Sequence, residues 1–419
     1  MAKIWRYLCL ATAAVGCVLA IRFTALFWDN PWPDPILTID GKSYLSAANG
    51  ATLGNLFDLS DFYHSPGYQI FLRLLFAIFG SSEAMIHAAK ILSLLMFFAS
   101  ALMIYRIGRR WFGSAVAEVA IALFLLSESW TYYCNMIQYE VLAGFLMLLF
   151  LSMLTAGEFT SQIKTSRGQG IGMGLVLAFL TLIQMRYAVL VLVPLIYAAI
   201  LHRRQAPKLE FRYFAIMLGT LFLVLSVWSL VQSLIHGRTI MVADGSKFRI
   251  HVSNNPNALG YSFPYPEVIE PSGWQFILSM PGQWLWLVGQ RALYLFGVKR
   301  DIWALPPQGF GSGPIGSYSP LDVISMILAA AGLSMVFMRI LRGELTAEPI
   351  AAILMLVGVM LPPLLIFGSK RFMVPVIPLV ALFQGYGIVA VGTGIYRACL
   401  APRSGTSLRL HSSSEEVQL

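Results

Sequence analysis

The segment that follows the first apolar run concentrates side chains able to do acid–base chemistry. Between residues 40 and 80 it holds the carboxyl groups of Asp40, Asp58 and Asp61 and the imidazole of His64. Charged residues make up only 12% of the chain. Ionisable groups kept beside a bilayer usually serve a function, because they are costly there. We therefore expect a functional site in this segment.

Hydropathy predicts the elements that must hold these groups. The chain has 419 residues, 58% of them hydrophobic, and a mean hydropathy of +0.72. Soluble domains are only about 45–50% apolar. Apolar runs of about 20 residues recur along the whole length, as in proteins that cross a membrane many times. We expect an all-α polytopic membrane protein, with one membrane domain over residues 1–400 and a disordered cytoplasmic tail over 401–419.

Composition argues against several other classes of protein. The four cysteines are scattered, without the spacing of a metal site or a disulfide framework. No glycine-rich nucleotide motif lies beside a strand–helix unit. The net charge of +9 is explained by basic loops on the cytoplasmic side of a membrane, so no nucleic acid is expected as a partner.

The apolar runs predict about ten transmembrane helices. They cover residues 7–27, 84–105, 114–130, 137–156, 171–185, 188–201, 213–235, 319–340, 348–368 and 372–396. Clusters of Lys and Arg fall in alternate loops, for example at Arg106, Arg109 and Arg110 after the second span. Basic loops favour the cytoplasmic side. We therefore expect both termini in the cytoplasm, a first outer loop over 28–83 and a large outer loop over 236–318.

Two further apolar stretches, residues 67–79 and 283–297, are too short to be counted as spans. Helices of about 13 and 15 residues reach roughly 20 Å, whereas the hydrocarbon core is about 30 Å thick. Counting 67–79 alone as a span would also invert every later loop. We expect both to be juxtamembrane helices at the outer surface; a short tilted span is the alternative.

The expected topology leaves an excess of cations in outer loops. These are Arg186, Lys247, Arg249, Lys299, Arg300, Lys370 and Arg371. Cations that do not set the topology can bind an anion, and phosphate is the ligand that they suit best. The alternative is that some of them pair with nearby acids or with lipid headgroups.

An ordered series of motifs runs through most of the chain. It comprises Asp40, Tyr44, Tyr63-His64-Ser65-Pro66-Gly67-Tyr68, Phe79-Gly80, Gly108-Arg109-Arg110-Trp111-Phe112-Gly113, Tyr132-Tyr133, Glu140, a polar turn with Arg186, Ser253-Asn254-Asn255-Pro256 and Lys370-Arg371. The series resembles the GT-C glycosyltransferases, in particular their bacterial branch related to protein O-mannosyltransferases and aminoarabinose transferases.

The resemblance implies a transferase that uses a polyprenyl-phosphate sugar. Such enzymes transfer the sugar, usually with inversion, to an acceptor on the outer face of the cytoplasmic (inner) membrane. The acceptor can be a glycan, a glycolipid or a protein. The donor is itself a lipid, so it enters from the bilayer. The leaving phosphate needs cations, and the acceptor hydroxyl needs a base.

The resemblance also implies roles for individual residues. Asp40 occupies the position of the general base, although Gly41 stands where the family often has Glu; helix capping is the alternative role of Asp40. The acceptor or sugar would contact His64, Tyr44, Tyr68 and Glu140. The lipid phosphate would be bound by Arg186, Lys370 and Arg371, with Lys299 and Arg300. No cofactor is firmly expected, and Asp40, His64 and Glu140 are the candidate ligands for a divalent metal.

Two other functions remain open at the level of sequence. A transporter or flippase for lipid-linked sugars would also be polytopic, but it should show two related halves with broken helices. An O-antigen ligase or polymerase would use the same lipid carriers. It would concentrate Arg and His in one later outer loop, and residues 236–318 keep that alternative open.

Overall fold

The structure is a computed structural model that describes residues 2–26, 28, 38–59, 64, 66–156, 167–203, 211–242, 246–261, 267–299 and 320–400. Over these ranges the chain is helical; its one β-bridge joins Tyr261 to Gly368. The helices are α1 (Ala2–Leu26), α2 (Thr38–Ala48), α3 (Pro66–Phe79), α4 (Ser82–Phe112), α5 (Ser114–Leu125), α6 (Glu128–Tyr133), α7 (Glu140–Thr155), α8 (Arg167–Ile183), η2 (Met185–Val191), α9 (Leu192–Arg203), α10 (Phe211–His236), α11 (Ser246–Ser253), α12 (Gly273–Ser279), α13 (Pro281–Leu295), α14 (Pro320–Leu341), α15 (Glu348–Leu365), η4 (Lys370–Val376) and α16 (Ile377–Leu400).

The predicted all-α membrane architecture is confirmed, and each of the ten predicted spans coincides with helical structure. In the described part of the chain, six helical segments are long and apolar enough to cross a membrane: α1, α4, α10, α14, α15 and η4–α16. The other four predicted spans correspond to α5, α7, α8 and η2–α9, which are shorter apolar helices of 10–17 residues. Length and composition therefore establish fewer spans than the ten predicted.

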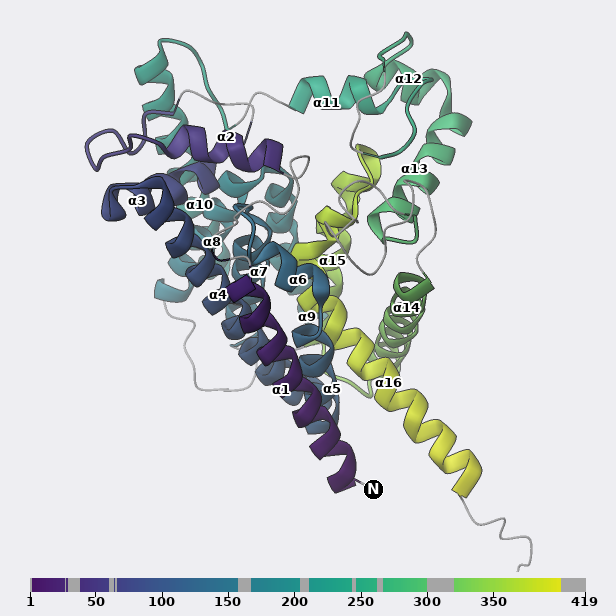
Figure 1. Ribbon diagram of the computed structural model, residues 1–419. Helices are drawn as coiled ribbons and strands as arrows, with labels where there is room; N and C mark the ends of the chain where they lie inside the picture. The colour runs from purple at the N-terminus through teal and green to yellow at the C-terminus, as the bar shows by residue number, and fades with distance from the viewer. Residues whose placement is uncertain are drawn as a thin grey trace, which may run out of the picture.

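The two ends of the helical bundle differ in what they carry. The N-terminal end of α1 and the C-terminal end of α16 lie at one end, and α2, α11 and α12 lie at the other (Figure 1). Near the termini, Arg110 donates to Glu348 Oε1 over 2.6 Å and to the carbonyl of Thr155. These two hydrogen bonds join the last turn of α4 to the start of α15 and to the end of α7. The predicted topology places these three helix ends on the same side of the membrane.

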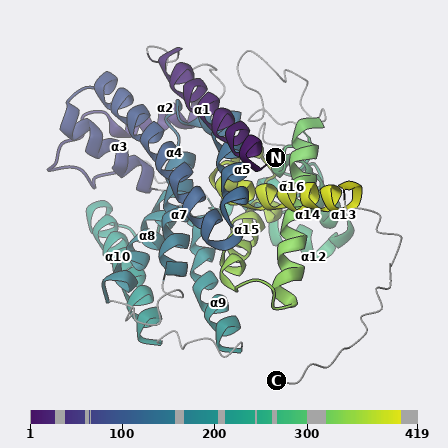
Figure 2. The ribbon, with the colours of Figure 1, turned by 90° about the horizontal axis from the view of Figure 1, so that it is seen from below.

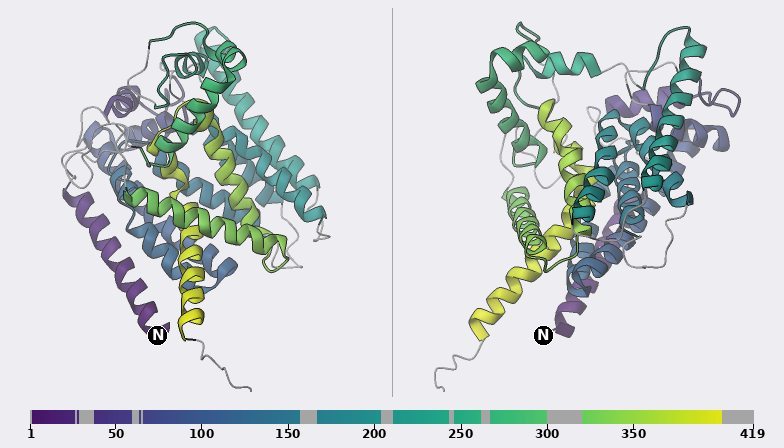
Figure 3. Two further views of the ribbon diagram at one scale, coloured as in Figure 1. Left: turned by 90° about the vertical axis from the view of Figure 1, so that its right-hand side faces the viewer. Right: turned by 180° about the vertical axis from the view of Figure 1, so that it is seen from behind.

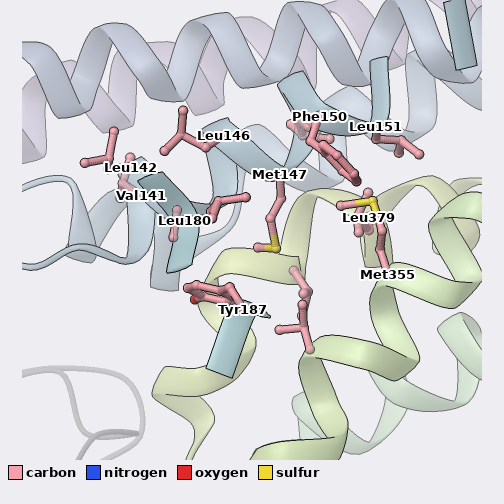
Figure 4. Close-up of a cluster of buried hydrophobic side chains, with 14 of the residues drawn as sticks. Val141, Leu142, Leu146, Met147, Phe150, Leu151, Leu180, Tyr187, Met355 and Leu379 are labelled. Atoms are coloured by element: carbon pink, nitrogen blue, oxygen red, sulfur yellow. The ribbon is translucent and has the colours of Figure 1, made fainter. Parts of the chain in front are cut away.

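Helix α7 lies at the centre of the hydrophobic core. Figure 4 shows side chains of α7 packed among others from α8, η2, α15 and α16. On α7 itself, Gly144 has no room for a side chain, because a Cβ there would lie 2.5 Å from the Trp130 ring and 2.9 Å from the Pro375 carbonyl. Trp130 also donates to the Val374 carbonyl over 2.5 Å. The turn that precedes α16 is therefore held against the middle of the bundle.

Helices α14 and α16 cross at a point where their backbones touch (Figure 3). A Cβ built on Gly332 would lie only 1.8 Å from the carbonyl oxygen of Phe383. Viewed along the bundle, α13, α14 and α16 lie on one side and α3, α8 and α10 on the other (Figure 2). Helix α16 also packs against α5, α4 and α7, so the last helix joins the two sides.

The two short helices predicted at the surface are α3 and α13, and each carries a buried arginine. Arg73 donates from α3 to the carbonyls of Ala47, Asn55 and Leu56 over 2.6–3.0 Å. Arg291 is fully buried on α13 and donates to the carbonyls of Leu364 and Leu365, the last residues of α15. These cations fix neighbouring backbone, because each satisfies carbonyl groups that have no helical partner.

Candidate active site

The first loop, the middle of the chain and the last turn meet around one buried arginine. Arg371 is 5% exposed and donates in three directions. Nη1 donates to Asp40 Oδ2 and Nη2 donates to Gln138 Oε1, each over 2.5 Å, while Nε donates to Glu140 Oε1. We call Asp40, Gln138, Glu140 and Arg371 the acid–arginine cluster. It unites residues separated by up to 331 positions.

Each member of the cluster stands at the end of a helical element. Asp40 lies in the first turn of α2, Glu140 is the first residue of α7, and Gln138 precedes it by two residues. Arg371 lies in the short 3₁₀ helix η4, where the Ser369 hydroxyl accepts from the Arg371 amide over 3.3 Å. The site is thus built where helices end and the chain turns.

Asp40 is the most accessible acid of the cluster. Its side chain is 25% exposed, whereas Glu140 is fully buried. Burial by itself raises the pKa of Asp40, but the charge of Arg371 and a hydrogen bond from His64 outweigh it and hold the pKa of this carboxyl below its usual range. Asp40 is therefore ionised at neutral pH and exposed enough to meet a substrate.

His64 contacts the oxygen of Asp40 that Arg371 leaves free. Its Nε2 lies 3.3 Å from Asp40 Oδ1, and its Nδ1 lies 3.3 Å from the hydroxyl of Ser43. An ionised carboxylate only accepts hydrogen bonds, so Nε2 carries a proton. Tyr44 packs against His64 with ring centroids 5.2 Å apart, and Tyr68 meets Tyr44 edge-on at 5.1 Å. Both tyrosines are almost fully buried, and Tyr44 packs directly against the imidazole.

A second arginine lies near the cluster with part of its guanidinium unpaired. Arg186 donates from Nη2 to the Tyr187 hydroxyl over 2.9 Å, and its guanidinium lies 4.4 Å from the centroid of the Phe372 ring. Its Nε and Nη1 are buried and have no hydrogen-bond partner among the described residues. A buried unpaired donor is costly, and an anion would satisfy both atoms.

The structure brings together most, but not all, of the residues predicted for the site. Asp40, His64, Tyr44, Tyr68, Glu140 and Arg371 form one connected group. Lys370 precedes Arg371 in η4 and is partly exposed. Lys299 follows α13 and donates to Gln290 of that helix over 2.8 Å. Arg300, together with Asp61 and the predicted tail 401–419, lies outside the described residues.

The candidate metal ligands do not form a metal site. Asp40 and His64 are in contact, but the guanidinium of Arg371 lies between the carboxylates of Asp40 and Glu140. No group of three or more His, Cys, Asp or Glu side chains in the described ranges could hold a metal ion. The negative charges of Asp40 and Glu140 are therefore balanced by the guanidinium of Arg371.

Sequence reasoning missed three polar residues of the site. Gln138 contacts Arg371, Ser43 contacts His64, and Tyr139 lies with its ring 5.4 Å from the Arg371 guanidinium and its hydroxyl 2.9 Å from Gln184. Gln138 and Tyr139 immediately precede Glu140, so their place beside that carboxylate could have marked them as site residues. Ser43 gave no such signal.

Comparisons with known proteins bear on this arrangement. The sequence matches the family model of dolichyl-phosphate-mannose-protein mannosyltransferases over residues 63–230. The oligosaccharyltransferase of Archaeoglobus fulgidus, in its apo form, has a similar structure, with a TM-score of 0.53 at 12% identity over 94% of this chain and 52% of that one. The fold of this chain is therefore similar to that of the GT-C membrane glycosyltransferases.

A second GT-C structure is similar over nearly the whole chain. ArnT from Cupriavidus metallidurans, solved with undecaprenyl phosphate bound, matches with a TM-score of 0.50 at 12% identity, over 95% of this chain and 64% of ArnT. The chain thus spans about half the length of the oligosaccharyltransferase and less than two thirds of ArnT. A search of curated proteins gives no match. Asp40 and Arg371 lie outside the range matched by the family model.

Proposed function

We propose that this GT-C protein transfers a sugar from a polyprenyl-phosphate donor to an acceptor at the outer face of the cytoplasmic membrane. The observation that carries the proposal is the pairing of an ionised, accessible Asp40 with the buried Arg371. Helix α2, which holds Asp40, lies at the end of the bundle opposite the termini (Figure 1). A transferase of this kind needs a base for the acceptor and cations for the leaving phosphate. Both termini then lie in the cytoplasm of a multi-pass inner-membrane protein.

The phosphate of the donor is assigned to Arg186 first. Its unpaired Nε and Nη1 match two oxygens of a phosphodiester, as a guanidinium binds phosphate in a fork. Arg186 lies beside Phe372, which directly follows Arg371. Lys370 of η4 and Lys299, which follows α13, are proposed as further ligands of the phosphate, as is Arg300 by its place in the sequence. ArnT was solved with undecaprenyl phosphate, the same class of ligand.

In the proposed reaction Asp40 takes the proton of an acceptor hydroxyl. The acceptor oxygen forms a bond to the anomeric carbon while the bond from that carbon to the phosphate oxygen breaks. The electron pair leaves with the phosphate, and Arg186 stabilises the charge that develops. Attack on the face opposite the phosphate inverts the anomeric centre. His64 holds Asp40 through Oδ1, and Tyr44, Tyr68 and Glu140 complete the surroundings of the sugar or acceptor.

One observation favours this function over a ligase or polymerase. Those enzymes were expected to use cations of the large outer segment, residues 236–318, for chemistry. Arg291, which lies in that segment, is fully buried and bonded to the carbonyls of Ser253, Leu364 and Leu365. It fixes the segment to the end of α15, and the accessible acid lies in the first loop instead.

The substitution Asp40→Asn tests the proposal. Purified protein in detergent would be supplied with a polyprenyl-phosphate sugar and cell-envelope glycan or glycolipid acceptors, and transfer would be followed by mass spectrometry. Loss of a general base lowers turnover by roughly 10²- to 10⁴-fold, while undecaprenyl phosphate should still bind. Turnover at the wild-type rate by a well-folded variant would refute the role of Asp40.

A further inference from the structure

The two arginines nearest Asp40 and Glu140 differ in what they have left to bind. Arg371 directs one nitrogen each at Asp40, Gln138 and Glu140, all of which belong to the protein. Arg186 has one hydrogen bond, to Tyr187, and two buried nitrogens without a partner among the described residues. A phosphate can therefore bind Arg186 without breaking a bond, whereas at Arg371 it would compete with two carboxylates.

Asp40 in this state is a weak base. General bases work best when their pKa lies near the operating pH, and Arg371 and His64 hold the pKa of Asp40 below its usual range. The titratable groups around Asp40 are His64 and Arg371, which contact its carboxylate, and the phenol of Tyr44; Tyr139 and Glu140 lie beyond them, against Arg371. Of these, Arg371 carries the positive charge that contacts the carboxylate at 2.5 Å.

We propose that Arg371 is a positioning residue that acts on the reaction through Asp40, keeping this base ionised but weak until a donor phosphate binds at Arg186. The inference rests on the proposed function. Glu140 links the two arginines, because it pairs with Arg371 and lies within electrostatic reach of Arg186. An anion at Arg186 opposes the field of the cations around Asp40. The proton affinity of Asp40 therefore rises once the donor phosphate is bound, which is when the acceptor hydroxyl must lose its proton.

The coupling has a structural basis in the short helix η4. Arg371 and Phe372 are consecutive residues there, one bonded to Asp40 and the other stacked on Arg186. An adjustment of Arg186 around a phosphate is therefore transmitted to Arg371 through a single peptide unit. The donor would both supply the sugar and prepare the base.

The test measures Asp40 directly, without catalysis. Infrared difference spectra between wild type and Asp40→Asn give the pH midpoint at which the Asp40 carboxyl is protonated in detergent. We expect saturating undecaprenyl phosphate to raise this midpoint by about one unit, a tenfold gain in proton affinity. Arg371→Gln should raise it without any phosphate. A midpoint that moves with neither change would overturn the inference.

Two further variants separate this role from phosphate binding. Arg371→Lys keeps a charge in the cluster; it should move the acid limb of the pH profile of kcat/KM to higher pH and leave the Kd for undecaprenyl phosphate within about twofold. Arg186→Gln should raise that Kd at least tenfold and abolish the phosphate effect on Asp40. If Arg371→Lys weakened phosphate binding and left the Asp40 midpoint unchanged, Arg371 would be a phosphate ligand instead.

The infrared midpoint does not depend on transfer. If wild type transferred no sugar while the midpoint still responded to Arg371→Gln and to phosphate, the proposed function would fail and the coupling would stand. Arg342→Lys is the matched control, since the Arg342 side chain is 65% exposed and its ion pair with Glu344 is long, at 4.0 Å. It should change neither the midpoint nor the Kd.

Discussion

Asp40 combines partial burial with ionisation, two properties that ordinarily oppose each other. The charge of Arg371 reconciles them, and Glu140 and Gln138 hold Arg371 in return. Buried charges are stable only when paired and hydrogen-bonded. The cluster should therefore respond very differently to the removal of one member and to the removal of all its charges.

Replacing Arg371 by Met should lower the free energy of unfolding by about 3–5 kcal/mol, because it leaves two carboxylates without their cation. The triple variant Arg371→Met, Glu140→Gln, Asp40→Asn should lose less than this single variant. Thermal unfolding in detergent measures both, with Arg342→Met as the exposed control. A triple variant no more stable than Arg371→Met would contradict the account.

The pH dependence of stability follows from the lowered pKa of Asp40. A carboxyl whose pKa is lowered by folding contributes stability that is fully present above its unfolded pKa of about 3.9, and this stability is lost as the pH falls through the folded value. In Asp40→Asn the contribution is absent. Unfolding measured between neutral pH and pH 3 should therefore show the wild type losing more stability than this variant; parallel curves would argue against the shift.

At the scale of elements, the turn before η4 positions Arg371. The Gly368 amide donates to the Gly260 carbonyl over 2.9 Å, and a Cβ at Gly368 would lie 2.1 Å from the Arg291 carbonyl oxygen. The turn therefore lies directly against α13 and the segment around Gly260. A displacement of α13 would be transmitted to Arg371.

The substitution Gly368→Ala should therefore reduce transfer at least tenfold, although residue 368 is not part of the cluster. Gly282→Ala is the matched control, because a Cβ at Gly282, on α13, meets no atom within 4 Å. Initial rates under saturating donor distinguish the two variants. Equal rates would show that contact between the turn and α13 does not set the position of Arg371.

The sequence predicts the helices and the individual charged residues better than it predicts their partners. Asp40, His64 and Glu140 stood out because carboxylates and imidazoles are rare in so apolar a chain. Gln138 and Ser43 did not, since uncharged polar residues are common there. Arg73, Arg291 and Arg371 are all cations beside apolar segments, and the sequence suggested phosphate as the ligand of Arg371. Only the folded chain distinguishes the two that bind carbonyl groups from the one that binds carboxylates.

At the scale of the whole molecule, the bundle separates two ionic clusters. Arg110 and Glu348 join α4 to α15 at one end, and the acid–arginine cluster lies toward the other. The predicted topology places the first end in the cytoplasm, because the Lys and Arg of the short loops gather there.

Cysteine labelling of intact cells tests this orientation. In a background without the four native cysteines, Leu53→Cys should react with an impermeant reagent, since Leu53 is 72% exposed near α2. Arg109→Cys, on an exposed turn at the end of α4, should react only after the membrane is permeabilised. The opposite pattern would invert the topology and move the proposed reaction to the cytoplasm.

The wide separation of Arg371 from its partners has a consequence for biosynthesis. Glu140 precedes Arg371 by 231 residues and Asp40 precedes it by 331. At about 5–20 residues per second, the ribosome needs roughly 10–50 s to travel from Glu140 to Arg371. During that interval the nascent chain holds two carboxylates without their guanidinium, so α7 cannot settle in its final environment until the last helices leave the ribosome.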